Sequence, residues 1–591
     1  MFPCPEFPWQ LYVGKETNYP ANIQQELQKA VNESFDFLRV PLSHPRYSQH
    51  PDIKRNNAFT RSDFCLPSDQ WNNCIQGKCN PNINPDSSCP KLREKWEKEM
   101  GRQIDWAVHL GVNAIVLPTP QLHCTNFARI LNQYLEKGFY YQKVHVEIPA
   151  DKWEIWNALR CMVGPSTALG VSLVITKELP EEKILDRWFG EPIMNVHIPR
   201  HIFLKNKQGF PVLPKEHQVF IQKLFKLKAS VLIGSARDAE QIRGYICYLF
   251  KNQPRLNKIQ SFSIDYWDNL QIPLQPLMHN LESMTYDIFE KDTVKYLLYE
   301  NAIYSALKDN ENYRIIMVVG AGRGPIASAA LRAGRKAQRN IKVYALDKNP
   351  NAIVTLYNLL STDWAGENIE VIESDMREWK PEEKADILVS ELLGSFGDNE
   401  LEPECLECAK HLVKEGGISI PCESISYLSP VSSQKNWTNA ITVEKVPETP
   451  YVSMLHNFYS PWTTQKCFQF NYPSPSSNYS RFSSFKFPVA TPLTIHGFGG
   501  YFESKLYKDI TLSTVPETHS KDMCSWFPMY FPIKEPIFCP GGSEIEISVW
   551  RCCGSGKVWY EWVINMWKDG MLYKSSGLHN PNGKTYWIGV R

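Results

Sequence analysis

The 591-residue sequence lacks the features that mark several special classes of protein. It has no run of 18 apolar residues, which argues against a membrane-spanning helix. Its first residues, MFPCPEFPWQ, lack the basic start and apolar run of a signal peptide. A formal net charge of +1 gives no electrostatic preference for nucleic acid or an anionic membrane. We therefore expect a soluble protein of the cytoplasm and nucleus that binds no membrane and no nucleic acid directly.

A disulfide framework is also missing. The 16 cysteines have no regular spacing, which favours reduced thiols in the cytosol or nucleus. The segment CLECAKH places Cys405, Cys408 and His411 at helical spacing, with Cys422 further along the chain. A structural zinc site needs four well-placed ligands, usually supplied as two pairs. These residues do not form two pairs, so we expect no metal site.

The sequence contains no internal repeat, and its length favours two to four domains. In residues 1–254, short apolar runs alternate with helical stretches, which is typical of parallel strands buried on both faces. About 250 residues of such units fit a TIM-like (β/α) barrel. Four runs end in proline, which cannot act as an acid or base, so we interpret the barrel as a scaffold that binds partners. The runs are 35–41, 113–118, 143–149, 170–176, 195–199 and 230–234, and the prolines are Pro41, Pro118, Pro149 and Pro199.

Two further domains are predicted after the barrel. Residues 255–422 comprise a connector and an α/β domain whose short strands alternate with helices, which indicates a doubly wound, Rossmann-like sheet. Residues 423–591 are rich in alternating runs, and the GSG at 554–556 is typical of a hairpin turn. This last part is predicted to be an antiparallel β-barrel or sandwich that serves substrate binding and oligomerisation. The strands of the α/β domain are expected at 315–320, 341–347, 369–375 and 385–391.

A nucleotide-type site is predicted at the carboxyl ends of the α/β strands. The first strand runs into GAGRGP, in which Gly320 and Gly322 allow close approach of a ligand to a helix N-terminus. The second strand ends at Asp347, and the third ends at Asp375, followed by Met376. A glycine motif alone is weak evidence, but three strand ends together indicate an adenosine-type ligand. Dehydrogenases and methyltransferases both bind such ligands.

The fourth strand opens the segment SELLGSFGDNE, which has Glu391 and Glu400 at its two ends. These glutamates could be solvated acids of a surface hairpin. In a buried site they would repel each other unless a cation lay between them. A guanidinium group presents the planar fork of donors that two carboxylates match. The pair therefore favours an arginine substrate over hydride transfer.

Several segments closely resemble the protein arginine methyltransferases, specifically the type II enzymes of the protein arginine methyltransferase 5 kind. The segments include VVGAGRGP, ALDKNPNA, ESDMREW and SELLGSFGDNELEPECL, and others such as PLQPLMHNLESMTYDIFEKD, HGFGGYFES and ETHSKDMCSWFP. The resemblance is dense from about 265 to 564, and LDRWFGEPI and NKQGFPVL extend it into the barrel. Taken together, these segments are highly specific for this family.

The resemblance implies roles for individual residues. Glu391 and Glu400 match the double-glutamate pair of the family and would be catalytic. Phe289 lies where the family places the residue that dictates symmetric dimethylation, and Trp526 would hold the substrate arginine. Each aromatic could instead be an ordinary core residue. The implied S-adenosylmethionine-binding residues are Tyr286, Lys295, Tyr296, Gly320, Gly322, Arg323 (methionyl carboxylate), Asp347 (ribose), and Asp375 with Met376 (adenine).

The implied activity is methyl transfer from S-adenosyl-L-methionine to arginine, giving mono- and symmetric dimethylarginine. The implied substrates are histone tails, spliceosomal Sm proteins and other Gly/Arg-rich proteins, which would make the enzyme a regulator of chromatin and transcription. The implied partners are a WD-repeat β-propeller protein, adaptor proteins and further copies of the chain. Two alternatives stay open at this point: a catalytically silent methyltransferase-fold scaffold, and a NAD-dependent oxidoreductase.

Overall fold

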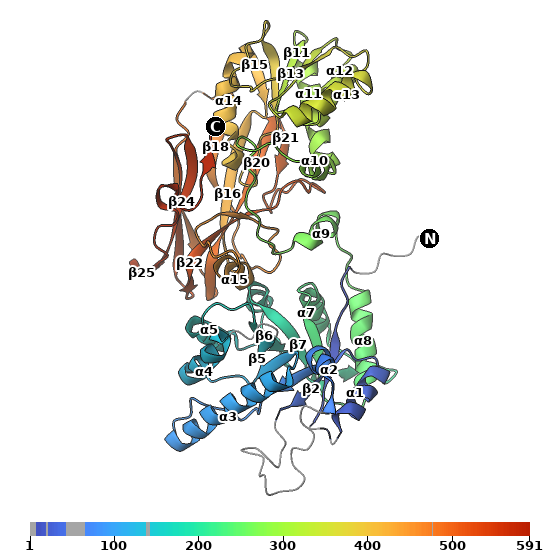
Figure 1. Ribbon diagram of the computed structural model, residues 1–591, viewed down its shortest axis with the longest axis vertical. Coiled ribbons are helices and arrows are strands. Elements are labelled where there is room, and N and C mark those ends of the chain that lie inside the picture. Colours follow the sequence, from blue (N-terminus) through green and yellow to red (C-terminus); the bar gives the residue numbers. More distant parts are fainter. Residues whose placement is uncertain are drawn as a thin grey trace. The chain divides into compact units, whose positions relative to one another are not determined.

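The computed structural model describes residues 8–18, 20, 22–42, 65–137, 142–474 and 477–590. The chain forms two compact units (Figure 1). Unit 1 comprises the chain up to Arg255 together with Ser433–Val443 and Asn457–Tyr459. Unit 2 comprises Leu256–Ser432, Glu444–His456 and the chain from Ser460 onwards. Within the described residues, no helix is both long and apolar enough to cross a membrane.

Unit 1 is a closed barrel of parallel strands. In the part of the chain that the structure describes, eight strands pair in the order β1-β10-β7-β6-β5-β4-β3-β2. Two of them, β1 and β3, were not predicted, because their sequences VGKE and IQGK are not apolar runs. The strands are β1 (Val13–Glu16), β2 (Phe37–Pro41), β3 (Ile75–Lys78), β4 (Ala114–Leu117), β5 (Lys143–Pro149), β6 (Leu169–Val174), β7 (Ile193–Ile198) and β10 (Ser230–Ile233).

Amphipathic helices cover the outside of this barrel (Figure 1). Their apolar faces pack on the outward side chains of the strands, as Trp153, Trp156 and Leu159 of α5 do in the core. The hairpin β8 (Leu204–Lys205) and β9 (Pro211–Val212) lies in the segment NKQGFPVL and its neighbours. The main helices are α1 (Ile23–Asn32), α2 (Ser68–Cys74), α3 (Pro90–Leu110), α4 (Thr125–Glu136), α5 (Trp153–Met162), α7 (Lys215–Phe225) and α8 (Ala239–Lys251).

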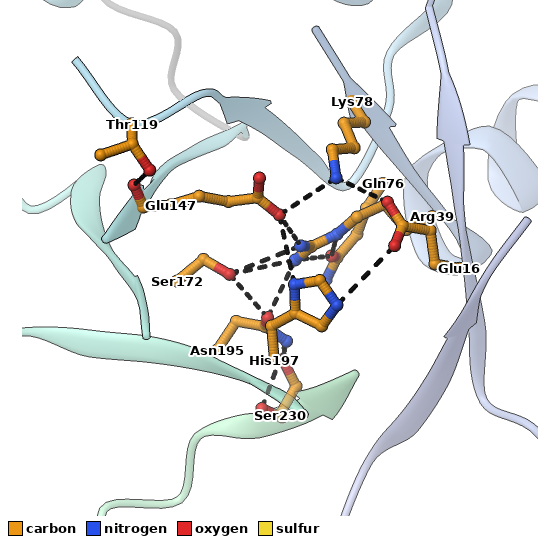
Figure 2. A network of polar contacts seen from close by, with 10 residues as sticks. All are labelled: Glu16, Arg39, Gln76, Lys78, Thr119, Glu147, Ser172, Asn195, His197 and Ser230. Atoms are coloured by element: carbon orange, nitrogen blue, oxygen red, sulfur yellow. Dashed lines mark hydrogen bonds and ion pairs between the residues drawn. The ribbon is translucent and has the colours of Figure 1, made fainter. Parts of the chain in front are cut away.

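Polar side chains fill the middle of the barrel (Figure 2). Arg39 is fully buried, and its guanidinium donates to Gln76 Oε1 at 2.9 Å, to Asn195 Oδ1 at 2.9 Å and to Glu147 Oε1 at 3.0 Å. Most barrels fill this space with branched apolar residues. The strands were expected to be apolar throughout, and this expectation is wrong for the inward-facing positions.

A second charged layer lies above Arg39, at the carboxyl ends of the odd-numbered strands. Lys78 donates to Glu16 Oε1 at 2.6 Å and lies 3.4 Å from Glu147 Oε1. His197 lies 3.7 Å from Glu16 Oε2 and 3.4 Å from Glu147 Oε1. Burial alone would raise the pKa of Glu147, but His197, Arg39 and Lys78 lower it to about 2.

The first half of unit 2 is a parallel sheet in the order β13-β12-β11-β14-β15, with helices on its faces (Figure 1). This arrangement confirms the predicted doubly wound sheet. Helices α9 (Lys258–Ser263), α10 (Ser283–Glu290) and α11 (Thr293–Asp309) precede it. The sheet comprises β11 (Ile315–Val319), β12 (Lys342–Asp347), β13 (Ile369–Glu373), β14 (Ala385–Ser390) and β15 (Val413–Ile420), with helices α12 (Pro325–Ala337), α13 (Pro350–Ser361) and α14 (Glu402–Ala409).

The rest of unit 2 consists of antiparallel sheets, as predicted. One sheet has the order β17-β22-β20-β16-β18, with β21 on β20, and another has the order β19-β23-β24-β25, with β26 on β24. Gly554 pairs with Lys557, so the predicted GSG hairpin joins β23 and β24. The strands are β16 (Glu423–Val431), β17 (Tyr451–Val452), β18 (Gln465–Asn471), β19 (Arg481–Pro488), β20 (Leu493–Tyr507), β21 (Ile510–Ser513), β22 (Met529–Cys539), β23 (Glu544–Gly554), β24 (Lys557–Lys568), β25 (Met571–Ser575) and β26 (Ile588–Gly589).

One helix between the strands of unit 2 belongs to unit 1. This helix, α15 (Gln434–Thr442), and the short segment Asn457–Tyr459 are both part of the barrel unit. Asn457 Nδ2 donates to the backbone oxygen of Glu191 at 3.1 Å. The barrel unit is therefore built from segments far apart in the sequence.

The charged network inside the barrel should stabilise the folded barrel. Glu147→Gln removes the negative charge beside Lys78 and the fully buried Arg39, and breaking a buried pair costs about 3–5 kcal/mol. We expect hydrogen exchange of the β2 and β5 amides to accelerate accordingly at neutral pH. The folded pKa of Glu147 is about 2 and the ordinary value is 4.5, so its contribution is present above pH 4.5 and declines as the pH falls towards 2.

Glu94→Gln is the matched control for this measurement. Glu94 pairs with Lys98 on the exposed surface of α3 in the same unit, where an ion pair contributes little. Exchange of the β2 and β5 amides should not change in this variant. Equal exchange in the Glu147→Gln and wild-type proteins would show that the network does not stabilise the barrel.

Candidate functional site

A cavity of about 380 Å³ lies in unit 2, at the carboxyl edge of the parallel sheet. The sequence-predicted site residues all line this cavity, although they come from six segments of the chain. They are Tyr286, Phe289, Lys295, Tyr296, Gly320, Gly322, Arg323, Asp347, Asp375, Met376, Glu391, Glu400 and Trp526. The structure therefore brings together every residue that the sequence analysis selected.

The glycine loop between β11 and α12 forms one wall of the cavity. Gly320 and Gly322 have φ of 69° and 55°, in the left-handed region that glycine adopts without strain. A Cβ atom on Gly320 would lie 2.9 Å from Leu392, and one on Gly322 would lie 3.0 Å from the ring of Tyr286. Pro325 begins α12, so the free N–H groups of this helix face the loop. The loop can hold a polar or anionic group close to the backbone.

Asp347 connects the end of β12 to the glycine loop. Its Oδ2 accepts from the backbone N–H of Gly322 at 2.7 Å, and its Oδ1 accepts from that of Asn349 at 2.7 Å. Asn349 Nδ2 also donates to the hydroxyl of Tyr286 at 3.2 Å. Burial raises the pKa of Asp347, although these N–H donors oppose the increase. Its predicted role as the acceptor for a ribose stays a prediction.

Asp375 and Arg377 form an ion pair after β13. Arg377 donates from Nε and from a terminal nitrogen to the two carboxylate oxygens of Asp375, at 2.9 and 2.7 Å. Burial would raise the pKa of Asp375, but Arg377 lowers it overall. Met376 lies between them in the sequence and contributes an apolar side chain to the cavity wall.

Arg323 holds α10 against the glycine loop. Its Nε donates to Glu290 Oε1 at 2.9 Å, and its terminal nitrogens donate to Glu290 Oε2 at 2.6 Å and to the hydroxyl of Ser283 at 3.1 Å. A terminal nitrogen of Arg323 also donates to Asp287 Oδ1, so the guanidinium is paired with two carboxylates of α10. The structure thus gives Arg323 a role in holding α10, and its predicted contact with a methionyl carboxylate stays a prediction.

Glu391 is paired with Lys295. Lys295 is 1% exposed, and its Nζ donates to Glu391 Oε2 at 2.9 Å. The other oxygen of Glu391 accepts from the backbone N–H of Leu393 at 3.2 Å. The Lys295 ammonium lies 5.1, 5.0 and 4.8 Å from the ring centroids of Phe289, Tyr296 and Trp526. These aromatic faces form a cage that attracts a cation.

Glu400 lines the same cavity at the other end of the loop. Burial and the neighbouring Glu391 raise the pKa of Glu400 well above its ordinary range, and Lys295 only partly offsets this increase. A second cation placed between the two glutamates would reverse this effect. The pair is therefore not a solvated surface hairpin, and its electrostatics favour a cationic ligand.

Trp526 closes the cavity from the side of the antiparallel sheets. Its Nε1 donates to the backbone oxygen of Leu393 at 2.8 Å, and its ring packs edge-to-face on Phe502 with centroids 5.1 Å apart. The indole is thereby fixed against the loop that carries Glu391 and Glu400.

Asp292 supports the site from outside the cavity lining, and the sequence analysis did not select it. It caps α11, since its Oδ1 accepts from the backbone N–H groups of Val294 and Lys295 at 3.1 and 3.3 Å. Its Oδ2 accepts from the N–H groups of Cys524 and Ser525 at 2.7 and 2.8 Å, and from the Ser525 hydroxyl at 2.8 Å. This buried carboxylate therefore joins the helix of Lys295 to the segment of Trp526. An aspartate directly before a helix is a capping signal that could have drawn attention to it.

Glu402, at the start of α14, is a second residue that the sequence analysis did not select. It is fully buried in the first turn of α14, and burial raises its pKa to about 8. Tyr472 donates to its Oε2 at 3.1 Å. This carboxyl therefore loses its proton at a higher pH than an exposed glutamate.

The cysteine cluster does not resemble a metal site. His411 lies 2.7 Å from the backbone oxygens of Cys408 and Trp379 through its two ring nitrogens. Across the residues that the structure describes, no three His, Cys, Asp or Glu side chains are grouped so that they could hold a metal ion.

Comparisons with known proteins cover nearly the whole chain. Residues 34–259 match the family profile described as PRMT5 TIM barrel domain, residues 257–420 match PRMT5 arginine-N-methyltransferase, and residues 423–588 match PRMT5 oligomerisation domain. The chain is 39% identical to protein arginine N-methyltransferase 5 of Xenopus laevis, over 98% of each chain. It is 38% identical to that of Oryza sativa subsp. indica, over 98% of each chain. It is 34% identical to protein arginine N-methyltransferase skb1 of Schizosaccharomyces pombe, over 94% of this chain and 96% of that protein.

Asp292 allows a direct test of how the site is held together. In Asp292→Asn one acceptor oxygen becomes an NH₂ group, which faces backbone N–H donors instead of accepting from them. We expect the first turn of α11 to lose about 1–3 kcal/mol of protection against hydrogen exchange, the cost of unsatisfied buried donors. The Cys524 and Ser525 amides should lose protection together with it.

Asp309→Asn, at the other end of α11, is the control, because Asp309 contacts Tyr507 and Lys508 and not the cavity. It should leave exchange at Val294, Lys295 and Ser525 as in the wild type. Unchanged exchange in Asp292→Asn would mean that its carboxylate does not join the two segments.

Proposed function

Because the chain belongs to the protein arginine N-methyltransferase 5 family, we propose that it transfers methyl groups from S-adenosyl-L-methionine to arginine side chains as a type II enzyme. The products would be monomethylarginine and symmetric dimethylarginine. The observation that carries this proposal is the pairing of Glu391 and Glu400 beside the glycine loop in one cavity. Histone tails, Sm proteins and other Gly/Arg-rich proteins are the proposed substrates.

The residues around the glycine loop fit this cofactor. Space for it exists because Gly320 and Gly322 carry no Cβ, and the N-terminus of α12 suits an anionic group such as a carboxylate. Asp347 would accept from the ribose hydroxyls, Asp375 and Met376 would contact the adenine, and Tyr286 and Tyr296 would cover the ligand. When bound, S-adenosylmethionine supplies an electrophilic methyl group on a sulfonium centre.

The two glutamates would bind and orient the guanidinium. Carboxylates bind this group through paired, charge-assisted hydrogen bonds, which fix its plane as well as its position. They would draw positive charge towards the nitrogens that they contact and leave electron density on the nitrogen that reacts. Such orientation supplies a large part of the rate enhancement for a transfer between two bound groups.

Glu400 would also suit the removal of a proton. Burial and Glu391 raise its pKa, and a carboxylate with a raised pKa is a stronger base than an ordinary glutamate. A guanidinium between Glu400 and Glu391 favours the ionised form of both, so substrate binding itself would prepare Glu400 to accept the proton.

Partners and localisation are further parts of the proposal. We propose that the chain forms a homo-oligomer, since its C-terminal residues match a family profile described as an oligomerisation domain. By family resemblance the barrel would bind a WD-repeat β-propeller protein, and the segment NKQGFPVL would bind adaptor proteins. The free thiols of the described cysteines suit the reducing cytoplasm and nucleus.

The activity is tested by comparing the wild type with Glu391→Gln. Calorimetry should show S-adenosylmethionine binding to both proteins, because Glu391 contacts Lys295 and not the glycine loop. Mass spectrometry of an arginine-containing histone-tail peptide should show methylation by the wild type only. Losing one charge of a buried pair costs several kcal/mol, which corresponds to a loss in rate of hundreds-fold or more.

Cofactor binding without methylation by the wild type would instead indicate a silent scaffold. Substantial activity in a folded Glu391→Gln protein would contradict the proposed role of the glutamate pair.

Phe289 is expected to control the product. Its ring is part of the aromatic cage around Lys295, so it can restrict which nitrogen of a monomethylated arginine reacts next. Methionine is unbranched and adaptable, so Phe289→Met should relax this restriction and yield some asymmetric dimethylarginine. Product analysis by mass spectrometry distinguishes the two isomers. An active variant that makes only symmetric dimethylarginine would assign Phe289 to packing alone.

A further inference from the structure

A fully buried arginine of the antiparallel sheets contacts the loop that carries the glutamate pair. Arg551 lies on β23, and its Nε donates to Asp398 Oδ2, two residues before Glu400. Its terminal nitrogens donate to the two oxygens of Glu404 on α14, both at 2.8 Å. Arg551 and Asp398 are both 0% exposed. One guanidinium therefore holds the chain on both sides of Glu400.

Asp398 is fixed by two further strands. The hydroxyl of Tyr560 on β24 donates to Asp398 Oδ2 at 2.7 Å, and the hydroxyl of Ser426 on β16 lies 2.9 Å from Asp398 Oδ1. A buried carboxylate with this many donors has little freedom to move, because each lost donor would leave the charge unsatisfied. The position of Asp398 is thus set by β16, β23 and β24.

Only Asn399 separates Asp398 from Glu400, and it too is held. Its Oδ1 accepts from the backbone N–H of Phe396 at 2.7 Å. The ring of Phe396 packs on Phe531 and Tyr560, with centroids 5.3 and 5.7 Å apart. The loop before Glu400 is therefore locked into the core of the antiparallel sheets.

Glu391 is positioned by a different part of the fold. It follows β14 of the parallel sheet and pairs with Lys295 of α11. The two glutamates are thus held by separate frames, Glu391 by the parallel sheet and Glu400 by the antiparallel sheets. The distance between the two carboxylates therefore depends both on the contacts that hold Glu391 at the parallel sheet and on those that hold Glu400 at the antiparallel sheets.

We propose that Arg551 is a positioning residue for the reaction, which acts through Asp398 to hold Glu400 in register with Glu391. The inference rests on the proposed function. It gives the C-terminal sheets a part in catalysis in addition to oligomerisation. An arginine is required because its planar fork reaches Asp398 and both oxygens of Glu404 at once, which the single ammonium of a lysine cannot do.

Arg551→Lys keeps the charge and removes the fork. We expect kcat for the arginine peptide to fall by at least 10-fold, with the affinity for S-adenosylmethionine unchanged within about twofold, as expected when only the orientation of a reacting group is lost. Hydrogen exchange at the amides of Phe396 and Leu401 should accelerate. A purely structural role would lower the melting temperature and leave kcat unchanged.

Arg481→Lys is the matched control. Arg481 lies opposite Arg551 on the neighbouring strand β19 and packs over the same ring, that of Phe470, but it donates to the backbone oxygens of Asn478 and Ser480. Its replacement should leave kcat and loop exchange as in the wild type. If Arg551→Lys does not fold, Tyr560→Phe removes one hydrogen bond to Asp398 with no change of charge and should lower kcat in the same direction.

The outcomes separate this inference from the proposed function. Wild-type kcat in a folded Arg551→Lys or Tyr560→Phe protein overturns the positioning role. If the wild type binds S-adenosylmethionine but does not methylate, the proposed function fails. In that case Arg551→Lys and the wild type are compared by hydrogen exchange at Phe396 and Leu401 and by calorimetry with the arginine peptide. If Arg551 positions Glu400, the variant should bind the peptide more weakly; equal binding and equal exchange would overturn the positioning role.

Discussion

The ion pair between Lys295 and Glu391 sets the charge balance of the site. Burial would lower the pKa of Lys295, but Glu391 raises it overall, so the ammonium stays charged inside the protein. Glu400 has no such direct partner among the described residues, and burial together with Glu391 raises its pKa well above the ordinary range. At the glutamate pair one ammonium thus faces two carboxylates, and this end of the cavity is arranged to accept one more cation. Aromatic rings around the ammonium exclude water and strengthen this electrostatic preference.

The parts of the site that could be predicted from the sequence are those that depend on local pattern. The carboxyl ends of neighbouring parallel strands meet at one edge, so the strand pattern alone was enough to group Gly320, Asp347, Asp375 and Glu391 in one site. The residues that hold them could not be found in this way. Arg551 and Asp398 are 153 positions apart, and no spacing rule relates a strand of one sheet to a loop that follows a strand of another.

The polar interior of the barrel was not predicted from the sequence. Six of the eight described strands were predicted from their apolar residues, yet the inward positions hold Arg39, Glu147 and His197 (Figure 2). These polar residues recur at alternate positions, as in KVHVEIP, and a period of two is the signal that distinguishes the two faces of a strand. Glu147 and His197 each lie two residues before a proline that ends such a run. The scaffold role of the barrel stays a prediction.

The membership of α15 in the barrel unit affects how the protein can be divided. The chain leaves unit 1 after Arg255, returns at Ser433 and again at Asn457, and ends in unit 2. A fragment that stops at residue 255 would lack Trp437 and Ala440, which are buried in the intact chain, and would leave the backbone oxygen of Glu191 without Asn457. The complementary fragment would expose the same apolar residues to water. Neither half is a free-standing module, so gene truncation at this boundary should give insoluble products, whereas cleavage of the intact protein after residue 255 should leave both halves associated.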